Sequence, residues 1–194
     1  MKYPVNEIFE SIQFEGERCG TRNIFIRLAG CNMDCPFCDT NTEDSVKLSV
    51  KEIVHILKNY LSCSNVILTG GEPMVHDLAL LLSALKAEGY YVAMESNGSL
   101  IENLYDEIRI DLVDWLTVSP KSPLDKEILK LAHETKYVVP DKEEIIWWDH
   151  PKVFLQPEWN NKAALARCRE LLRAKDFKGN VKLSIQTHNY LGLR

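Results

Sequence analysis

The sequence predicts an α/β fold with a largely parallel sheet, because short apolar runs alternate along the chain with longer segments of helical spacing. The apolar runs are rich in Val, Ile and Leu, as expected of strands buried on both faces. Strands that alternate with helices form right-handed βαβ units, which place neighbouring strands parallel. The length of 194 residues suits a single core, and no linker or repeat interrupts the alternation. We therefore expect residues 1–194 to form one domain.

The predicted strands are recognised by their apolar runs and by the loops that bound them. Residues 7–13 alternate weakly and indicate an N-terminal strand or extended arm, and the charged segment 14–22 indicates a loop. The remaining strands share a short apolar run that ends at polar or glycine residues. They cover residues 24–29, 66–68, 91–94, 115–118, 136–139, 153–155 and 181–185.

Helices are predicted between these strands from capping residues and apolar spacing. Ser49 and Glu52 form a capping box before a run of apolar residues at helical spacing. Asp77 suits the cap of a Leu-rich helix that ends at Gly89. The other predicted helical segments lie around residues 101–107, 124–132, 141–148 and 161–175.

The composition argues against several classes of partner. Lys and Arg number 23 and Asp and Glu number 28, which gives a formal net charge of −5 and no basic stripe. We therefore expect no binding to a nucleic acid backbone. No apolar run approaches the length of a membrane span and no signal peptide is visible, so we expect no membrane contact. Three of the six cysteines are too closely spaced for a disulfide framework, which indicates a reduced, cytoplasmic protein.

Three cysteines follow the run at 24–29 with C-x3-C-x2-C spacing, at Cys31, Cys35 and Cys38. Three thiolates are one fewer than a closed zinc or iron–sulfur site requires. One interpretation is a 4Fe–4S cluster that keeps one iron open to a small molecule. The other is a structural zinc knuckle whose fourth ligand, such as His55 or His76, comes from elsewhere in the chain.

Several unusual polar motifs each follow directly after a predicted strand. In parallel α/β folds the carboxyl ends of the strands lie at one edge, where ligands bind. We therefore expect the motifs to converge, which a surface zinc knuckle would not require. They are the cysteine loop, TGGEP at 69–73, ESNG at 95–98, SPK at 119–121, QPEW at 156–159 and QTH at 186–188.

The cysteine loop with the following Asp39 and Thr40, combined with the TGGEP motif, resembles the radical S-adenosylmethionine (SAM) enzymes. In that superfamily the open iron binds SAM by its amino and carboxylate groups, and the Gly-Gly loop holds the SAM amino group. The resemblance implies an incomplete parallel βα barrel, smaller than the usual radical SAM core.

A closer similarity, to the 7-carboxy-7-deazaguanine synthase family, covers nearly the whole chain. The motifs that carry it are SIQFEGE at 11–17, FIRLAGCN at 25–32, CDT at 38–40, LTGGEP at 68–73, TVSPK at 117–121, LQP at 155–157 and SIQTH at 184–188. Phe14 departs from the family pattern, which usually has Gly there, and residues 157–159 differ from the commoner sequence after Gln-Pro.

This resemblance implies a reaction and its cofactors. The family converts 6-carboxy-5,6,7,8-tetrahydropterin to 7-carboxy-7-deazaguanine and releases ammonia, on the route to queuosine and other 7-deazapurines. The implied cofactors are a 4Fe–4S cluster, SAM and Mg²⁺, the implied reductant is flavodoxin or ferredoxin, and the implied assembly is a homodimer. No side chain is implied as a catalytic acid or base, because the radical arises at cluster-bound SAM.

Position by position, the resemblance assigns the predicted site residues to four groups. The cluster ligands are Cys31, Cys35 and Cys38, and the Mg²⁺ ligand is Thr40. The residues lining SAM are Phe37, Cys38, Asp39, Gly71, Ser119, Pro120, Lys121, Gln156, Pro157, Glu158 and Trp159. The substrate contacts are Ile12, Gln13, Phe14, Arg27, Thr69 and Arg194.

The chemistry of three of these residues suits the implied roles. Arg27 can pair bidentately with a carboxylate, and its ordinary alternative is a surface ion pair at a strand end. Gln13 offers a donor and an acceptor to a pterin edge, and its alternative is an exposed strand residue. Thr40 offers a hard oxygen to Mg²⁺, and its alternative is a turn or cap residue. Among the histidines, His188 is the one expected near the pocket.

Two other functions stay open from the sequence. A glycyl-radical-enzyme activase of the radical SAM class shares the cysteine spacing and the short length, but it explains neither residues 12–13 nor residues 119–121. A non-catalytic zinc-binding module explains the cysteines alone. The colour of the purified protein distinguishes the zinc-binding module from the radical SAM enzymes, because an anaerobically purified iron–sulfur protein is brown and a zinc protein is colourless.

Overall fold

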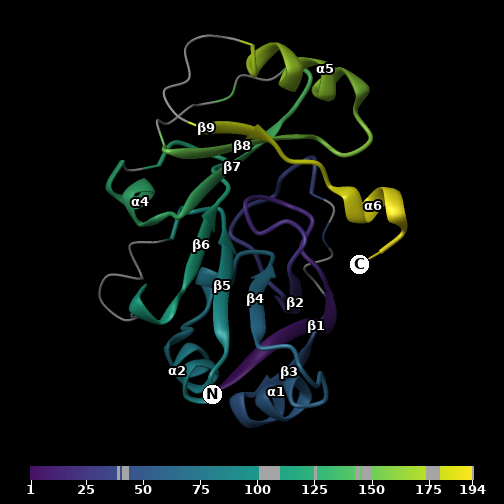
Figure 1. Cartoon of the computed structure of the whole chain (residues 1–194). Helices are drawn as coiled ribbons and strands as arrows, with labels where there is room; N and C mark the ends of the chain where they lie inside the picture. Colours follow the sequence, from purple (N-terminus) through teal and green to yellow (C-terminus); the bar gives the residue numbers. More distant parts are fainter. Residues whose placement is uncertain are drawn as a thin grey trace. The chain divides into compact units, whose positions relative to one another are not determined.

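The computed structural model describes residues 1–38, 40, 44–100, 110–124, 126–142, 145, 150–173 and 180–193. The chain divides into two compact units, which are described in turn (Figure 1). Unit 1 comprises Met1–Ile12, Arg22–Ser96 and Leu100–Leu116, and unit 2 comprises Gln13–Thr21, Asn97–Ser99 and Thr117–Arg194. The predicted helix around 101–107 and most of the segment 141–148 lie outside the described residues. The expectation of one domain stays a prediction.

The sheet of unit 1 has the strand order β3-β1-β2-β4-β5-β6. Its strands are β1 (Lys2–Ile12), β2 (Arg22–Leu28), β3 (Val46–Ser49), β4 (Asn65–Gly70), β5 (Tyr91–Ser96) and the first half of β6 (Trp115–Val118). β1 runs antiparallel to β2 and β3, whereas β2, β4 and β5 run parallel to one another. The carboxyl ends of these three parallel strands therefore share one edge.

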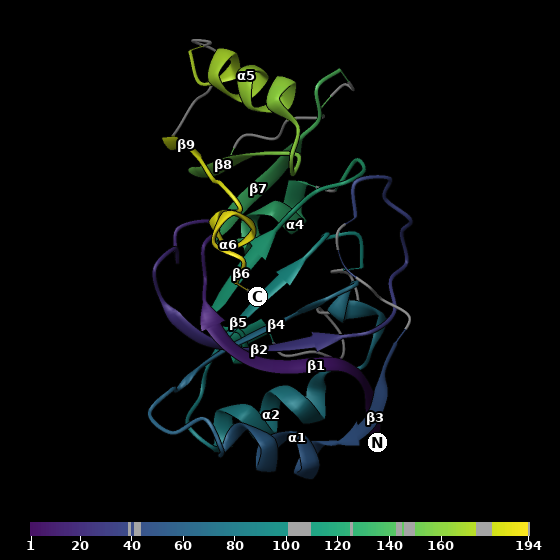
Figure 2. The same cartoon turned by 90° about the vertical axis from the view of Figure 1, so that its right-hand side faces the viewer.

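Two helices, α1 (Val50–Leu57) and α2 (Ala79–Ala87), pack together on one face of this sheet (Figure 2). The predicted capping box is confirmed, because Glu52 N–H donates to Ser49 Oγ over 3.3 Å and Ser49 N–H donates to Glu52 Oε2 over 2.7 Å. The apolar faces of both helices are buried, as are the strand residues below them. Two short 3-10 helices complete the unit, η1 (Pro73–Val75) and η2 (Ile110–Leu112).

Unit 2 contains a parallel sheet in the order β6-β7-β8-β9. Its strands after β6 are β7 (Glu134–Val139), β8 (Lys152–Pro157) and β9 (Asn180–Leu183), and its helices are α4 (Lys126–Leu131), α5 (Lys162–Leu171) and α6 (Thr187–Leu191). α5 packs on β7 and β8, with Asn161 capping its first turn. Tyr137, Val139, Val153, Leu155 and Cys168 form the buried core of this unit.

Each predicted strand overlaps a strand of the structure, but the ends differ, and β9 ends at Leu183 rather than at residue 185. β1 begins at Lys2 rather than at residue 7, and β7 begins at Glu134 rather than at residue 136. β3 and α6 were not predicted, since β3 forms by pairing with the distant strand β1 and α6 spans only one turn. The helix assigned to Asp77 begins two residues later, at Ala79, whose N–H donates to Asp77 Oδ1 over 3.0 Å.

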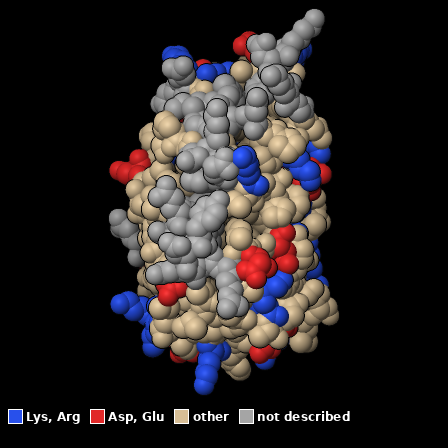
Figure 3. Space-filling view, turned by 90° about the vertical axis from the view of Figure 1, so that its left-hand side faces the viewer, with Lys and Arg blue, Asp and Glu red and all other residues tan. Residues whose placement is uncertain are grey.

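The described surface mixes charges of both signs. On the face shown in Figure 3, Lys and Arg side chains stand among Asp and Glu side chains. Among the described residues, exposed or half-exposed partners form the ion pairs Arg22–Glu10, Arg27–Glu7, Lys58–Glu88, Lys86–Asp114 and Lys182–Glu17. In the part of the chain that the structure describes, no helix is both long and apolar enough to cross a membrane.

Candidate active site

The three clustered cysteines lie in the loop that follows β2. Cys31 and Cys38 are exposed thiols and Cys35 is a partly exposed one. Cys38 N–H donates to Cys35 O over 3.0 Å, and Met33 N–H lies 3.4 Å from Cys31 Sγ. These bonds turn the loop back on itself and leave its sulfur atoms accessible to a ligand.

The three thiols can each bind a different iron of a 4Fe–4S cluster. Among the described residues, no group of three Cys, His, Asp or Glu side chains is placed to hold a single metal ion. His76, one possible zinc ligand, instead donates from Nε2 to Ala29 O over 2.7 Å. Three accessible thiols on one loop therefore suit a cluster of this kind.

Gly70 and Gly71 bring the end of β4 into backbone contact with the residues before Cys31. Gly71 N–H donates to Leu28 O over 3.1 Å, and Glu72 N–H donates to Gly30 O over 2.9 Å. A Cβ on Gly71 would lie well under 3.0 Å from Gly30 O, and one on Gly70 would lie equally close to Leu28 O. Both positions therefore need glycine, and the TGGEP loop is joined directly to the cysteine loop.

The side chain of Glu72 holds the TGGEP loop in place. This side chain is fully buried, and Oε1 accepts hydrogen bonds from Met74 N–H at 3.0 Å and from Ser96 Oγ at 2.8 Å. A buried carboxylate needs such partners to offset the loss of hydration. The bond to Ser96 joins the TGGEP loop after β4 to the carboxyl end of β5.

Arg27, predicted to bind substrate, lies on β2 opposite Glu7 of β1 and beside Thr69 of β4. Its Nε donates to Glu7 Oε1 over 2.8 Å, and its Nη1 lies 3.4 Å from Thr40 Oγ1. The guanidinium also lies 5.8 Å from the centre of the Phe9 ring. Arg27 thus forms an ion pair at a strand end, which was the ordinary alternative to substrate binding. Its guanidinium also lies beside Thr40, the predicted magnesium ligand.

The remaining predicted residues of unit 1 lie on the same strands and loops. Phe37 and Thr40 are partly exposed in the cysteine loop, and Ile12 ends β1 as an exposed side chain. Thr69 is partly exposed near the end of β4. Asp39, predicted to line SAM, and Arg194, predicted to reach the substrate, lie outside the described residues.

In unit 2, two predicted SAM-lining segments follow parallel strands. Lys121 folds back after β6, and its Nζ donates to Ser119 O over 3.1 Å and to Ser119 Oγ over 2.5 Å. Pro120 between them is partly exposed. Gln156 is buried in β8, where its Oε1 accepts from Ser184 Oγ over 3.2 Å. Because β6 and β8 run parallel, both segments lie at the carboxyl edge of this sheet.

The segment after Gln156 is held by α5 and α6. Pro157 ends β8, and Glu158 N–H donates to Val139 O over 3.0 Å. The Glu158 carboxylate accepts from Asn161 Nδ2 over 2.8 Å. Trp159 packs edge-to-face against Tyr190 of α6, with ring centres 4.8 Å apart. Residues 157–159 depart from the family pattern, and Glu158 and Trp159 among them contact neighbouring side chains of this chain.

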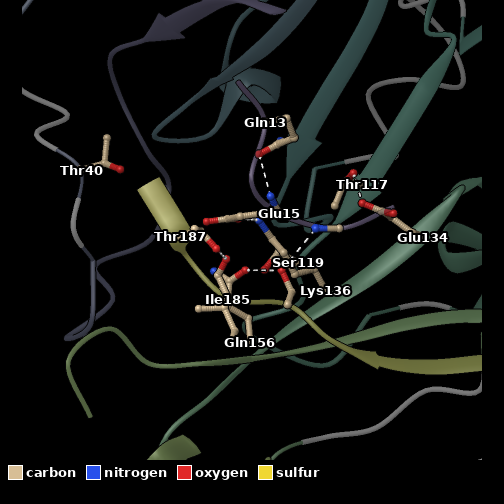
Figure 4. Close-up of polar contacts among 12 residues, drawn as sticks. Gln13, Glu15, Thr40, Thr117, Ser119, Glu134, Lys136, Gln156, Ile185 and Thr187 are labelled. Carbon is tan, nitrogen blue, oxygen red and sulfur yellow. Dashed lines mark hydrogen bonds and ion pairs between the residues drawn. The ribbon is translucent and has the colours of Figure 1, made fainter. Parts of the chain in front are cut away.

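Residues 13–17 form a loop (the 13–17 loop) that carries the predicted substrate residues Gln13 and Phe14. Figure 4 shows Gln13 and Glu15 of this loop. Gln13 is buried, and the Phe14 ring lies 6.4 Å from the ring of His188, the histidine expected near the pocket. Three successive residues of the loop contact the sheet of unit 2. Glu15 forms an ion pair with Lys136. Gly16 N–H donates a hydrogen bond to Ser184 Oγ over 3.2 Å, and Glu17 N–H donates one to Glu134 Oε2 over 2.9 Å.

Two β7 residues in this group, Glu134 and Lys136, were not predicted from the sequence. Both are buried, and Glu134 Oε1 also accepts from Thr117 Oγ1 over 2.8 Å. Burial raises the pKa of Glu15, but Lys136, His188 and Gln186 lower it more, so the net pKa lies below its ordinary value. The available signal was the two charged residues Glu134 and Lys136, placed two apart directly before the apolar residues 137–139.

Residues 25–146 match the model of the radical SAM superfamily. The match spans the cysteine loop and the TGGEP loop, whose backbone contact is described above. The fold and the site thus define a radical SAM enzyme, with the predicted α/β class of a partial parallel βα barrel. This class carries a 4Fe–4S cluster and SAM.

Curated relatives define the family within this class. The chain is 34% identical to a 7-carboxy-7-deazaguanine synthase of Buchnera aphidicola subsp. Schizaphis graminum and 35% identical to one of Bacteroides thetaiotaomicron, with all of each chain covered in both comparisons. The crystal structure of QueE from Escherichia coli superimposes with a TM-score of 0.75 at 26% identity, covering 96% of this chain and 94% of that one. The chain belongs to the 7-carboxy-7-deazaguanine synthase family.

Proposed function

We propose that this enzyme converts 6-carboxy-5,6,7,8-tetrahydropterin to 7-carboxy-7-deazaguanine and ammonia, in the biosynthesis of queuosine or another 7-deazapurine. The observation that supports this most directly is full-length similarity to synthases of that name, together with a cysteine loop joined by backbone bonds to the TGGEP loop. When bound, the cluster and SAM supply the carbon-centred radical that removes a hydrogen atom from the substrate.

In this proposal the residues of unit 1 hold the cofactors. Cys31, Cys35 and Cys38 supply three thiolates, and the TGGEP loop, which main-chain hydrogen bonds hold against the cysteine loop, would bind the SAM amino group. In unit 2, we propose that the segments 119–121 and 156–159 contact SAM. The protein thereby contributes orientation and exclusion of water rather than acid–base chemistry.

The direct test is anaerobic incubation of the cluster-loaded enzyme with SAM, a reductant and carboxytetrahydropterin, followed by mass analysis of the products. We expect a product that has lost ammonia, with SAM recovered rather than consumed. Cleavage of SAM without any change in the pterin would contradict the proposed substrate.

Arg27 is proposed to bind the substrate carboxylate. Arg27→Lys keeps the positive charge but removes the planar fork, so we expect the KM for the pterin to rise about 10- to 100-fold, the effect of losing a hydrogen bond between charged groups. SAM affinity should stay near the wild-type value. The partly exposed ion pair with Glu7 contributes at most about 1 kcal/mol, so the melting temperature should change little. An unchanged KM would assign Arg27 to the Glu7 pair alone.

We propose that Thr40 would supply an oxygen ligand to Mg²⁺, which would offset the negative charge of the substrate carboxylate. The contact of Arg27 Nη1 with Thr40 Oγ1, at 3.4 Å, supports this by bringing a hydroxyl oxygen beside the proposed carboxylate-binding residue. Thr40→Val keeps the shape and removes the oxygen, so we expect lower turnover and a flattened response to added Mg²⁺.

Iron content and magnesium titration of Thr40→Val, measured on one preparation, separate this role from a turn role. A residue that only shapes the cysteine loop would lose iron when replaced. Wild-type activation by Mg²⁺ in Thr40→Val would show that Thr40 is not the ligand.

Three further features complete the proposal. We propose flavodoxin or ferredoxin as the electron donor, because the cluster needs a low-potential reductant and these carriers are the family's implied partners. We also propose a homodimer in the cytoplasm, where the exposed thiols of Cys31 and Cys38 would stay reduced.

A further inference from the structure

The ion pair between Lys136 and Glu15 is buried, and removing its two charges from water costs more free energy than is needed to hold a loop in place. The two side chains are 7% and 11% exposed. Taking two charges out of water commonly costs more than their attraction returns, and apolar residues of similar size often stabilise a core as well. Lys182 and Glu17 fasten the same loop by an exposed pair, at 2.8 Å, without that cost. The buried pair therefore points to a role beyond loop stability.

Glu15 connects this ion pair to Gln13. Its N–H donates to Gln13 Oε1 over 3.0 Å, as Figure 4 shows. A main-chain N–H can only donate, so the amide atom that faces it must be the oxygen. The Gln13 amide nitrogen, which lies in the same plane on the other branch of the amide, therefore points away from the Glu15 N–H. The main chain of Gln13 is fixed separately by hydrogen bonds with Thr21 O and Gly20 N–H.

We propose that Lys136 is a positioning residue for the pterin and acts through Glu15 on the Gln13 amide. This inference rests on the proposed function, in which Gln13 contacts the substrate. In the fixed orientation the Gln13 side chain presents its NH₂ group as a donor, which suits an acceptor of the pterin ring such as the 4-oxo group.

Loss of the Lys136 charge would leave the Glu15 carboxylate buried without its closest cation. The carboxylate must then take up a proton or draw in water, and in either case the 13–17 loop loses the ion pair that holds it and shifts. That shift withdraws the Glu15 N–H from Gln13 and frees the amide to rotate. Binding of the pterin should weaken, whereas the cysteine loop and the TGGEP loop, which belong to unit 1, should keep their structure.

The test uses 6-carboxypterin, an oxidised and unreactive relative of the substrate that keeps its carboxylate and its ring edge. Lys136→Met retains the length of the side chain and removes its charge. Calorimetry on the cluster-loaded enzyme should show binding weakened at least about tenfold, the coupling expected within one hydrogen-bonded network. The KM for carboxytetrahydropterin should rise in parallel. Iron content and SAM affinity should equal those of the wild type.

Lys182→Met is the matched control, because it removes an exposed lysine that pairs with Glu17 of the same loop. Its binding of 6-carboxypterin should change by less than about twofold, as for exposed ion pairs generally. An equal loss in both variants would mean that any charge near the loop suffices, and it would overturn the specific role of Lys136.

Two double variants separate positioning from folding. Glu15→Gln with Lys136→Met holds no unpaired buried charge, so its melting temperature should recover while binding of 6-carboxypterin stays weak. Lys136→Met with Gln13→Met should bind little more weakly than either single variant, because both act through one amide.

Wild-type binding by Lys136→Met, or binding that recovers together with the melting temperature, would overturn the proposal. Fully additive losses in the Gln13 cycle would do the same. If the wild-type enzyme neither binds 6-carboxypterin nor forms product, the proposed function itself fails, which is a different result.

Discussion

Replacing Cys35 with alanine is expected to remove most of the bound iron and to abolish turnover. Cys31, Cys35 and Cys38 are the thiols that follow β2 within a single loop, and a cluster held by three thiolates has none to spare. Cys31→Ala and Cys38→Ala should give the same result. Iron per protein chain after anaerobic reconstitution, and product formation on the same sample, are the two measurements.

Cys63→Ala and Cys168→Ala are the matched controls for the loss of a thiol. Burial raises the pKa of Cys168 to about 11, while Arg167 lowers it slightly, so this thiol stays neutral and is a poor metal ligand. Cys63 is buried too, with Sγ 3.7 Å from Arg22 O and from Asn65 O. Both variants should retain wild-type iron. A Cys35→Ala enzyme with full iron and turnover would refute the assignment.

The fold class could be predicted because its signals are local. An apolar run such as 66–68 and a capping box such as Ser49 with Glu52 depend on neighbours in the sequence, and the structure has both. β3 could not be predicted in this way. Its four residues are exposed or half-exposed, and they form a strand because β1, more than forty residues away, offers its edge.

The candidate site also has parts that could be predicted from the sequence and parts that could not. The loops after β2, β4, β6 and β8 could be located from the sequence, because each follows a short apolar run. The partners of those loops could not. Lys136 was placed at the start of a strand and Glu134 outside it, so neither could be connected to Glu15, which lies more than a hundred residues earlier. Contacts of this separation leave no periodic pattern in the sequence.

Gly71→Ala is expected to lower turnover about 100-fold, the cost of displacing reacting groups by about 1 Å. The added Cβ would lie well under 3.0 Å from Gly30 O, a main-chain atom that no change of rotamer can move. Either the TGGEP loop or the segment leading to Cys31 must therefore shift. We expect weaker SAM binding and a loss of about 1–3 kcal/mol of stability, as for other overpacked sites.

Gly89→Ala is the control that separates this steric effect from a general loss of stability. Gly89 has a φ of +81° and no atom within 4 Å of its would-be Cβ, so alanine there is strained but meets no clash. It should lose about 1–2 kcal/mol of stability, the cost of a left-handed conformation, and keep its turnover and SAM affinity. Both variants would then unfold at lower temperatures, but only Gly71→Ala would lose SAM binding. Wild-type SAM affinity and turnover in Gly71→Ala would mean that the close approach of the TGGEP loop to Gly30 is not needed for binding SAM.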